Sequence, residues 1–185
     1  MIFAFAALYA SAQSFNDDGC GSTDDRRAQK YFEKAMETYY DNREETRQNL
    51  IRAVQEDEDF ANAYYVLADL AYRKSKNSMY ESMRTKSRER AKKLMMRVVE
   101  LCPAYDDYHL NYLIGEMCFL ERDFETARDY LKTYKNHSSD TVPEYSATVS
   151  MLEEIEIYFD LKNIRSLLIP NRWEAFPQTR MNTCR

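Results

Sequence analysis

The feature that most constrains the fold is a spacing of small and apolar residues that recurs along the chain. Tyr64, Leu67, Ala68 and Ala71 have the same offsets as Asn111, Ile114, Gly115 and Cys118. Likewise, Ala91, Met95, Val98 and Pro103 have the offsets of Ala127, Leu131, Tyr134 and the polar break at 137–139. A small residue within a helix lets a second helix approach closely, and a proline or polar break ends each pair. The spacing predicts stacked antiparallel helical hairpins with a period near 34 residues.

Apolar residues at helical spacing occupy most of the chain from about Asp24 onwards. We expect seven helices, containing residues 28–39, 50–54, 61–73, 88–101, 108–120, 124–134 and 143–161. The sequence has only 3 glycines and 4 prolines, too few for the dense turns of an all-β sandwich. The predicted fold class is therefore all-α.

The third hairpin has the most specific sequence, Asn-Tyr-Leu-Ile-Gly-Glu-Met-Cys-Phe at 111–119 followed by Asp-Phe-Glu-Thr-Ala-Arg-Asp-Tyr-Leu at 123–131. The second matches it through 63–68 and 91–103 but has about eleven extra residues between its helices. The first is degenerate and has Glu58 where proline is expected. Residues 24–136 resemble the tetratricopeptide (TPR) repeat family. The resemblance implies a right-handed superhelix of antiparallel helix hairpins, about three repeats plus a capping helix, over residues 24–162.

In that family the first helices of the repeats line a concave groove that binds a peptide or helix of another protein. The resemblance places eleven residues there: Phe32, Met36, Tyr39, Asn62, Tyr65, Asp69, Tyr72, His109, Tyr112, Glu116 and Phe119. Aromatic side chains in a groove are good anchors for a protein partner. Two other interpretations stay open: these rings belong only to the hairpin core, or the last helix of the chain fills the groove.

A basic stretch stands out in a chain whose net charge is −5. It consists of Arg84, Lys86, Arg88, Arg90, Lys92, Lys93 and Arg97, with Glu89 as the only acidic residue between them. We expect an acidic protein or an anionic envelope polymer as its partner, and no nucleic acid, because no base-stacking motif accompanies it. The alternative is a solvated outer helix face together with a flexible loop.

The N-terminus predicts export. Residues 2–10 form an apolar run, and Ala10-Ser11-Ala12 supplies small residues for cleavage before Gln13, although no basic residue precedes the run. We therefore predict a signal peptide at 1–12, a linker at 13–23 and a periplasmic or outer-membrane-associated location. The alternative is a buried first strand or helix. The run is shorter than the ~20 residues that cross a bilayer, and no second one follows, so we expect no transmembrane segment in the mature chain.

The residues that carry chemistry are few. The four cysteines lack metal-ligand spacing, and Cys102 and Cys118 flank one helix, about 20 Å apart at ~1.5 Å per residue, too far for a disulfide. His109 and His137 lie in no nucleophile, metal or phosphate motif. We interpret Glu153, Glu154 and Glu156 as a solvated helix face. The sequence predicts no catalytic residues, no metal site and no cofactor.

Residues 163–185 lose the periodicity and are predicted to be an irregular tail. A signal, three repeats and a capping helix also resemble the N-terminal part of Bacteroidetes envelope proteins in which a β-propeller and an OmpA-like peptidoglycan-binding domain follow. There the propeller opens on roughly Asp-Glu-Tyr-Leu-Pro. Read one base earlier, the codons of 181–185 encode Glu, then Tyr or His, then Leu, Met or Val, then Pro or Ser. We therefore predict a frameshifted tail and a truncated chain, with peptidoglycan association only indirect, through the missing domains.

Together these features predict a non-catalytic protein–protein interaction module of the bacterial cell envelope, which scaffolds an envelope or secretion assembly through its groove. The expected partner is a peptide or helix of an envelope component. Two alternatives remain open at this stage. One is a structural spacer whose groove is self-filled. The other is an intracellular TPR regulatory or adaptor protein, if the N-terminal run is not a signal.

Overall fold

The computed structural model describes residues 20–168, and in this range the chain is all-α, with seven α-helices, one 3₁₀-helix and no strand. The fold class predicted from the sequence is confirmed. The predicted signal peptide at 1–12, most of the predicted linker, and residues 169–185 of the predicted tail lie outside the described residues.

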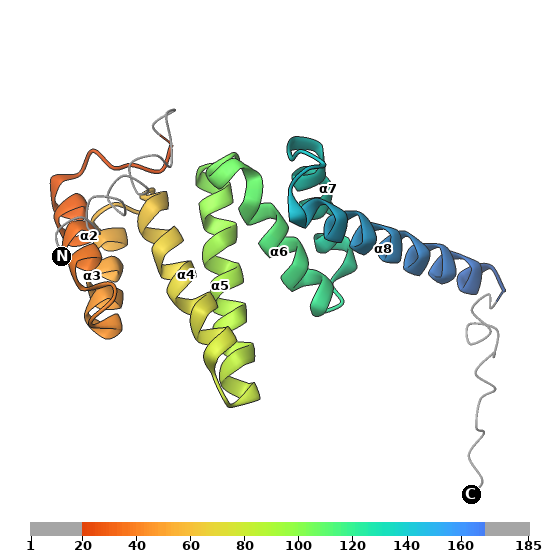
Figure 1. The fold of residues 1–185 in the computed structure, drawn as a ribbon, viewed down its shortest axis with the longest axis horizontal. Helices are drawn as coiled ribbons and strands as arrows, with labels where there is room; N and C mark the ends of the chain where they lie inside the picture. Colours follow the sequence, from red (N-terminus) through yellow and green to blue (C-terminus); the bar gives the residue numbers. More distant parts are fainter. Residues whose placement is uncertain (1–19, 169–185) are drawn as a thin grey trace, which may run out of the picture.

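The helices form consecutive antiparallel hairpins, which lie side by side in Figure 1. Their bounds are α2 Arg26–Thr38 and α3 Arg43–Glu56, α4 Ala61–Asn77 and α5 Glu81–Leu101, α6 His109–Leu120 and α7 Phe124–His137, then α8 Pro143–Leu168. The short helix η1, Tyr105–Tyr108, joins α5 to α6. The most extensive helix–helix contacts lie within the three hairpins, as the repeating spacing predicts.

Side-chain caps fix where several helices begin. Asp25 Oδ1 accepts hydrogen bonds from the backbone N–H groups of Arg27 and Ala28, at 2.7 and 2.9 Å. Asn42 caps α3 and Asp123 caps α7 in the same way, through the N–H groups of Glu45 and Thr126. These caps satisfy amide groups that have no partner within their own helix.

The small residues at the repeated positions lie at the helix crossings. Ala68 of α4, Ala91 of α5 and Ala127 of α7 have no exposed surface, and Gly115 of α6 is buried against Leu131 of α7. One hydrophobic cluster joins α2, α3 and α4, and a second extends from α4 to α8. The core is therefore continuous along the array, and each hairpin packs against its neighbours.

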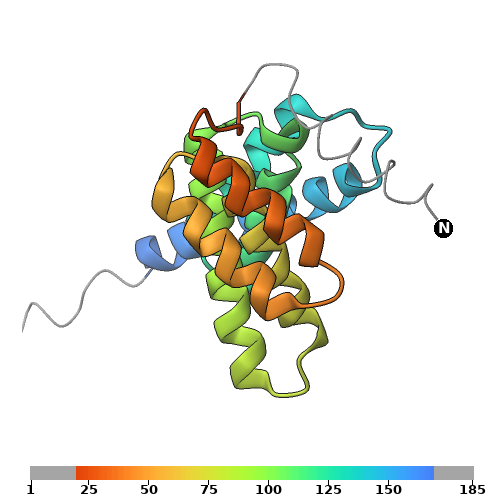
Figure 2. The same ribbon diagram turned by 90° about the vertical axis from the view of Figure 1, so that its left-hand side faces the viewer.

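The second hairpin is longer than the sequence analysis predicted. We expected helices over 61–73 and 88–101 with about eleven extra residues between them, but α4 continues to Asn77 and α5 already begins at Glu81. The intervening residues are mostly Lys, Arg, Glu, Met and Ser, with no glycine or proline, so the segment favours helix. The hairpin consequently projects beyond its neighbours, as Figures 1 and 2 show.

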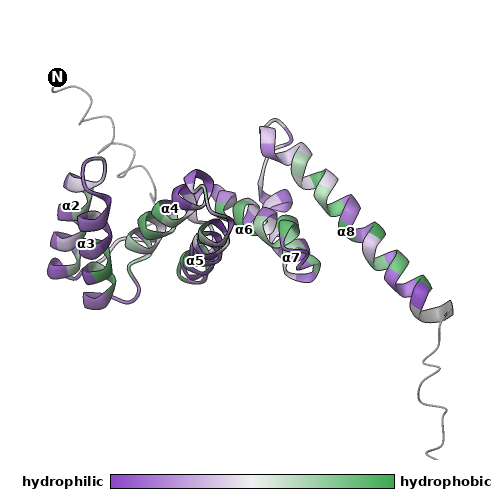
Figure 3. Ribbon diagram, turned by 90° about the horizontal axis from the view of Figure 1, so that it is seen from below, coloured by the Kyte–Doolittle hydropathy of each residue, from purple (hydrophilic) through white to green (hydrophobic). Residues whose placement is uncertain are grey.

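Helix α8 packs on the last hairpin and then extends away from the array (Figures 1 and 3). It begins with a proline at its first position, where the missing N–H costs nothing. Thr148, Leu152 and Ile155 are buried, whereas Ile157, Leu161 and Ile164 on the opposite face are more than half exposed. The helix passes residue 162, the predicted end of the repeat domain, and ends at Leu168. Between residues 20 and 168, no helix combines the length and hydropathy needed to cross a bilayer.

Candidate interaction face

The eleven predicted groove residues lie on the first helices of the three hairpins or directly at their ends, and all of them are partly exposed. We call this set the first-helix face. Phe32, Met36 and Tyr39 belong to α2 and its C-terminal end, Asn62 to Tyr72 to α4, and His109 to Phe119 to α6. A residue of the hairpin core would be fully buried, as Ala68 and Ile114 are. Partial exposure leaves each of these side chains some surface for a contact.

A polar cluster joins α2 to α4 across this face. The Tyr39 hydroxyl donates a hydrogen bond to an Asp69 carboxylate oxygen. Arg73, one turn further along α4, donates from Nε to both Asp69 oxygens at 2.9 and 2.8 Å, and its guanidinium lies 5.9 Å from the centre of the Tyr39 ring. Burial and the Asp69 hydrogen bond raise the pKa of Tyr39. The phenol therefore stays protonated and keeps donating.

In the middle of the face, Tyr65 and Asn62 of α4 contact Tyr105, which is buried in the α5–α6 connection. The Tyr65 and Tyr105 ring centres are 5.1 Å apart, and the Tyr105 hydroxyl donates to Asn62 Oδ1 at 2.7 Å. Burial, together with Asp106 and Asp69, raises the pKa of Tyr65 to about 12. These contacts fix the Tyr65 ring, which loses little conformational entropy when a partner binds it.

Tyr72 of α4 and Glu116 of α6 line one shallow depression, together with Ser75, Lys76, Arg88, Met117 and Leu120. One turn before Glu116, the Tyr112 ring lies 5.5 Å from that of Tyr134 on α7 and 6.0 Å from that of His109. The face is thus continuous from α4 to α6. It consists of the depression beside Tyr72 and, next to it, the neighbouring rings of His109 and Tyr112.

At the two ends of the face, the aromatic side chains mainly pack within their own hairpins. Phe32 packs on the buried Phe60 with ring centres 5.0 Å apart, and Phe119 packs on Phe124 at 5.6 Å. Both phenylalanines adjoin the hydrophobic clusters of their hairpins, as does Met36. The polar and tyrosine-rich part of the face is therefore its centre, on α4 and α6.

Acidic groups lie near both central tyrosines of this face. Asp106 and Asp69 raise the pKa of Tyr65, after the larger effect of burial, and Glu116 and Glu144 do the same for Tyr112. Both burial and nearby negative charge disfavour the phenolate, and burial has the larger effect on the pKa of both tyrosines. The face therefore combines aromatic rings with carboxylates, whereas Arg73 pairs with Asp69, and Lys76 and Arg88 line the depression beside Glu116.

The connection that carries His109 has an unusual backbone. Asp106, Asp107 and Tyr108 have consecutive positive φ angles of 54°, 47° and 65°, which are costly for residues other than glycine. Three contacts hold it: Tyr105 is buried, Tyr108 stacks on His137 with ring centres 3.8 Å apart, and His109 Nδ1 lies 3.3 Å from Asp106 Oδ2. The Asp106 contact raises the pKa of His109. Both histidines of the chain therefore hold this turn.

Some residues of the predicted basic stretch form ion pairs and others do not. Lys92 pairs with Glu121, Lys93 with Glu89, Arg97 with Asp59 and Glu100, and Arg84 with Glu81. Lys86, Arg88 and Arg90 form no ion pair with a described acidic residue. The excess positive charge is therefore concentrated on the projecting part of the second hairpin, and the rest of the stretch is largely neutralised by neighbouring helices.

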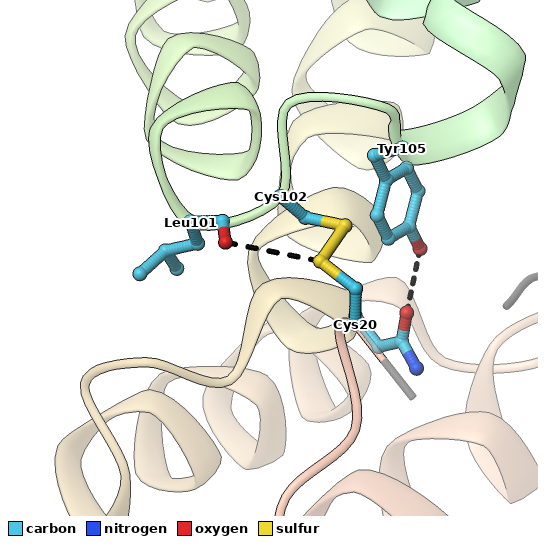
Figure 4. The surroundings of a disulfide bond; sticks show 5 residues. Cys20, Leu101, Cys102 and Tyr105 are labelled. Carbon is cyan, nitrogen blue, oxygen red and sulfur yellow. Dashed lines mark hydrogen bonds between the residues drawn. A yellow bond between two sulfur atoms is a disulfide. The ribbon is translucent and has the colours of Figure 1, made fainter. Parts of the chain in front are cut away.

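The structure contains a disulfide that the sequence analysis missed. Cys20, just before α2, is bonded to Cys102 at the end of α5, 82 residues away (Figure 4). The Leu101 carbonyl oxygen lies 3.8 Å from the Cys20 sulfur. Beside the bridge, the Asn62 N–H donates to the Gly21 carbonyl at 3.0 Å. Residues 20–23, predicted as part of a linker, are therefore held against the start of α4.

The described residues contain no group of His, Cys, Asp and Glu side chains arranged to hold a metal ion. Cys118 is a buried thiol whose pKa burial raises to about 11, so it is a poor nucleophile at neutral pH. No protein-family model matches the chain, and no curated protein matches it either.

Proposed function

We propose that the chain is a non-catalytic, TPR-like protein–protein interaction module that binds a protein segment on the centre of the first-helix face. The observation that carries the proposal is the continuity of this face across helices. Tyr39 of α2 bonds Asp69 of α4, and Tyr72 of α4 shares a depression with Glu116 of α6. Partly exposed aromatic rings held by their neighbours are typical anchors of protein contacts.

The hairpin periodicity supports the TPR-like assignment. Helices α2 and α4 begin 35 residues apart, at Arg26 and Ala61, close to the TPR period of about 34. Helix α6 begins 48 residues after α4, because the projecting second hairpin is inserted between them.

The position of α8 favours an open face over the alternative of a self-filled spacer. Helix α8 packs on α6 and α7, through Leu152 and Ile155, an ion pair of Glu156 with Lys132 at 3.2 Å, and Arg128 over the Phe159 ring. It then extends away from α2 and α4 (Figure 3). The acidic groups near Tyr65 and Tyr112 suit a partner segment that has basic side chains beside apolar anchors.

The disulfide supports the proposal that the module is exported to the bacterial envelope, because such bonds persist in oxidising compartments. Cleavage before Gln13 would leave Cys20 in the mature chain. In cells, alkylation of thiols before and after reduction should show Cys20 and Cys102 protected until reduction, and N-terminal sequencing should find Gln13 first. Alkylation of both cysteines without reduction, in a chain with an intact residue 1, would instead support the intracellular adaptor.

The face is tested by placing a photo-crosslinking residue at Tyr72 and capturing the bound protein in envelope extracts. We expect Tyr65→Ala/Tyr112→Ala and Asp69→Asn/Glu116→Gln to lose the crosslink. Ile157→Ala/Leu161→Ala, which removes two large apolar side chains on the exposed side of α8, should keep it. Circular dichroism of each variant checks the fold. Equal crosslinking by the face variants and wild type would reject the face as the binding site.

A further inference from the structure

The end of the second hairpin exposes large apolar side chains, which is unusual for a charged surface. Met79 is 92% exposed, Tyr80 67% and Met83 51%. They follow α4 directly and occupy the turn and the first residues of α5. Figures 1 and 2 show this end projecting past the neighbouring helices, so nothing in the described array stands between it and an external surface. We call these three residues the hairpin tip.

Basic side chains surround the tip. Residues 73–90 contain seven Lys and Arg against two Glu, a net charge of +5 in a chain whose total is −5. Lys76 lies at the end of α4, over the Tyr72 ring at 5.1 Å, and is not paired with a described acidic residue. On α5, Met83, Lys86 and Arg90 follow at i, i+3 and i+7 and so share one face. Lys76, Lys86 and Arg90, which form no ion pair with a described acidic residue, therefore lie close behind the apolar hairpin tip.

The distances along the helix suit a lipid surface. At about 1.5 Å per residue, Lys86 lies roughly 8 Å along α5, and Arg88 and Arg90 roughly 10–14 Å along it. Helices at a membrane interface bury their apolar residues about 5–10 Å deep, which brings these cations to the level of the lipid phosphates. Their attraction to an anionic leaflet extends about a Debye length, ~8 Å at physiological salt.

From these observations we propose that the hairpin tip docks the protein on an anionic lipid bilayer, with Met79 and Tyr80 inserted among the headgroups and Lys76, Lys86 and Arg88 on the lipid phosphates. An anionic polymer without apolar groups would satisfy the cations but leave the apolar end in water. A bilayer accepts both, and tyrosine and long basic side chains are typical of its interface. The proposal does not depend on the first-helix face binding a partner.

The test uses the purified chain without the predicted signal peptide, residues 13–185, and sedimentation with vesicles of phosphatidylcholine, with or without phosphatidylglycerol. We expect binding only to the anionic vesicles, weakening as salt is added. Lys76→Gln/Lys86→Gln/Arg88→Gln should reduce the partition coefficient about 100-fold, since each cation contributes about fivefold. Met79→Ser/Tyr80→Ser should reduce it at least about tenfold. Matched controls elsewhere, Lys30→Gln/Lys34→Gln/Arg43→Gln and Tyr40→Ser/Ile157→Ser, should bind like wild type.

Insertion itself is read out with Tyr80→Trp in a Trp173→Phe background, which removes the only natural tryptophan. We expect its fluorescence to shift to the blue and to be quenched by lipids brominated in their acyl chains, whereas Tyr40→Trp should not respond. Wild-type binding by the tip variants would overturn the proposal. So would binding that depends on charge but not on Met79 and Tyr80, as for an anionic polymer. Tyr65→Ala/Tyr112→Ala should bind vesicles normally, so the two proposals can fail separately.

Discussion

Gly115 of α6 lies so close to Leu131 of α7 that a Cβ atom at Gly115 would be 2.6 Å from Leu131 Cγ and 2.7 Å from Cδ2. Leu131 is fully buried, so it has little room to move. We expect Gly115→Ala to lower the free energy of unfolding by about 1–2 kcal/mol, because the clash outweighs the ~1 kcal/mol gain in helix propensity. Urea denaturation measures this. An increase in stability, as at an exposed helical glycine, would contradict the close approach.

The same contact can be examined from its other side. Leu131→Ala should cost about 2–5 kcal/mol on its own, because it leaves a cavity. In the double variant the methyl group introduced at position 115 would enter that cavity. We therefore expect Gly115→Ala/Leu131→Ala to cost less than the two single changes added together. Strict additivity would show that the two residues do not contact each other.

The Cys20–Cys102 disulfide closes a loop of 82 residues and should stabilise the fold by restricting the unfolded chain. We expect Cys20→Ser/Cys102→Ser to lower the free energy of unfolding by about 2–4 kcal/mol. A reducing agent should destabilise the wild-type protein by a similar amount and leave the double variant unchanged. Cys118→Ser serves as the control for a cysteine outside the bridge. A reductant-insensitive melting temperature of the wild type would exclude the disulfide.

The His109–Asp106 contact predicts a pH dependence with a definite sign. Because Asp106 raises the pKa of His109 in the folded chain, the contact stabilises the fold fully below the unfolded value near 6.5. This stability is lost as the pH rises through the folded pKa. NMR titration should find the His109 pKa above 6.5 and return it towards that value in Asp106→Asn, which tolerates the same backbone.

The positive φ angles of the α5–α6 connection predict opposite effects for two substitutions at Asp107. Its side chain is exposed, so the backbone dominates the outcome. Asp107→Gly should be neutral or stabilising by up to about 1 kcal/mol, because glycine adopts this conformation without strain. Asp107→Val should destabilise by about 1–2 kcal/mol, since a β-branched residue disfavours it strongly. Melting temperatures of the two variants rank them. Equal effects would refute a left-handed turn.

Several parts of the fold followed from local patterns. The offsets of Ala68, Gly115, Ala91 and Ala127 predicted the helix crossings, because only small residues allow such close packing, and all four residues are buried. The length of the second hairpin was predictable too, from the helix-forming residues between Arg73 and Arg88. The predicted bounds stopped at residues 73 and 88 because they followed the stripe of apolar residues, which this polar segment lacks, rather than helix propensity.

By itself, the sequence determined the fold class and the hairpin order, because these depend on periodicity within about a dozen residues. The positions of the first-helix face came from the family resemblance. The tertiary structure alone decided which distant groups meet. It brought Cys20 to Cys102, set Asp69 against Tyr39, and paired Lys92 with Glu121 while Lys86 stayed unpaired. Such partners depend on how the hairpins stack, and residue spacing within one helix carries no information about that.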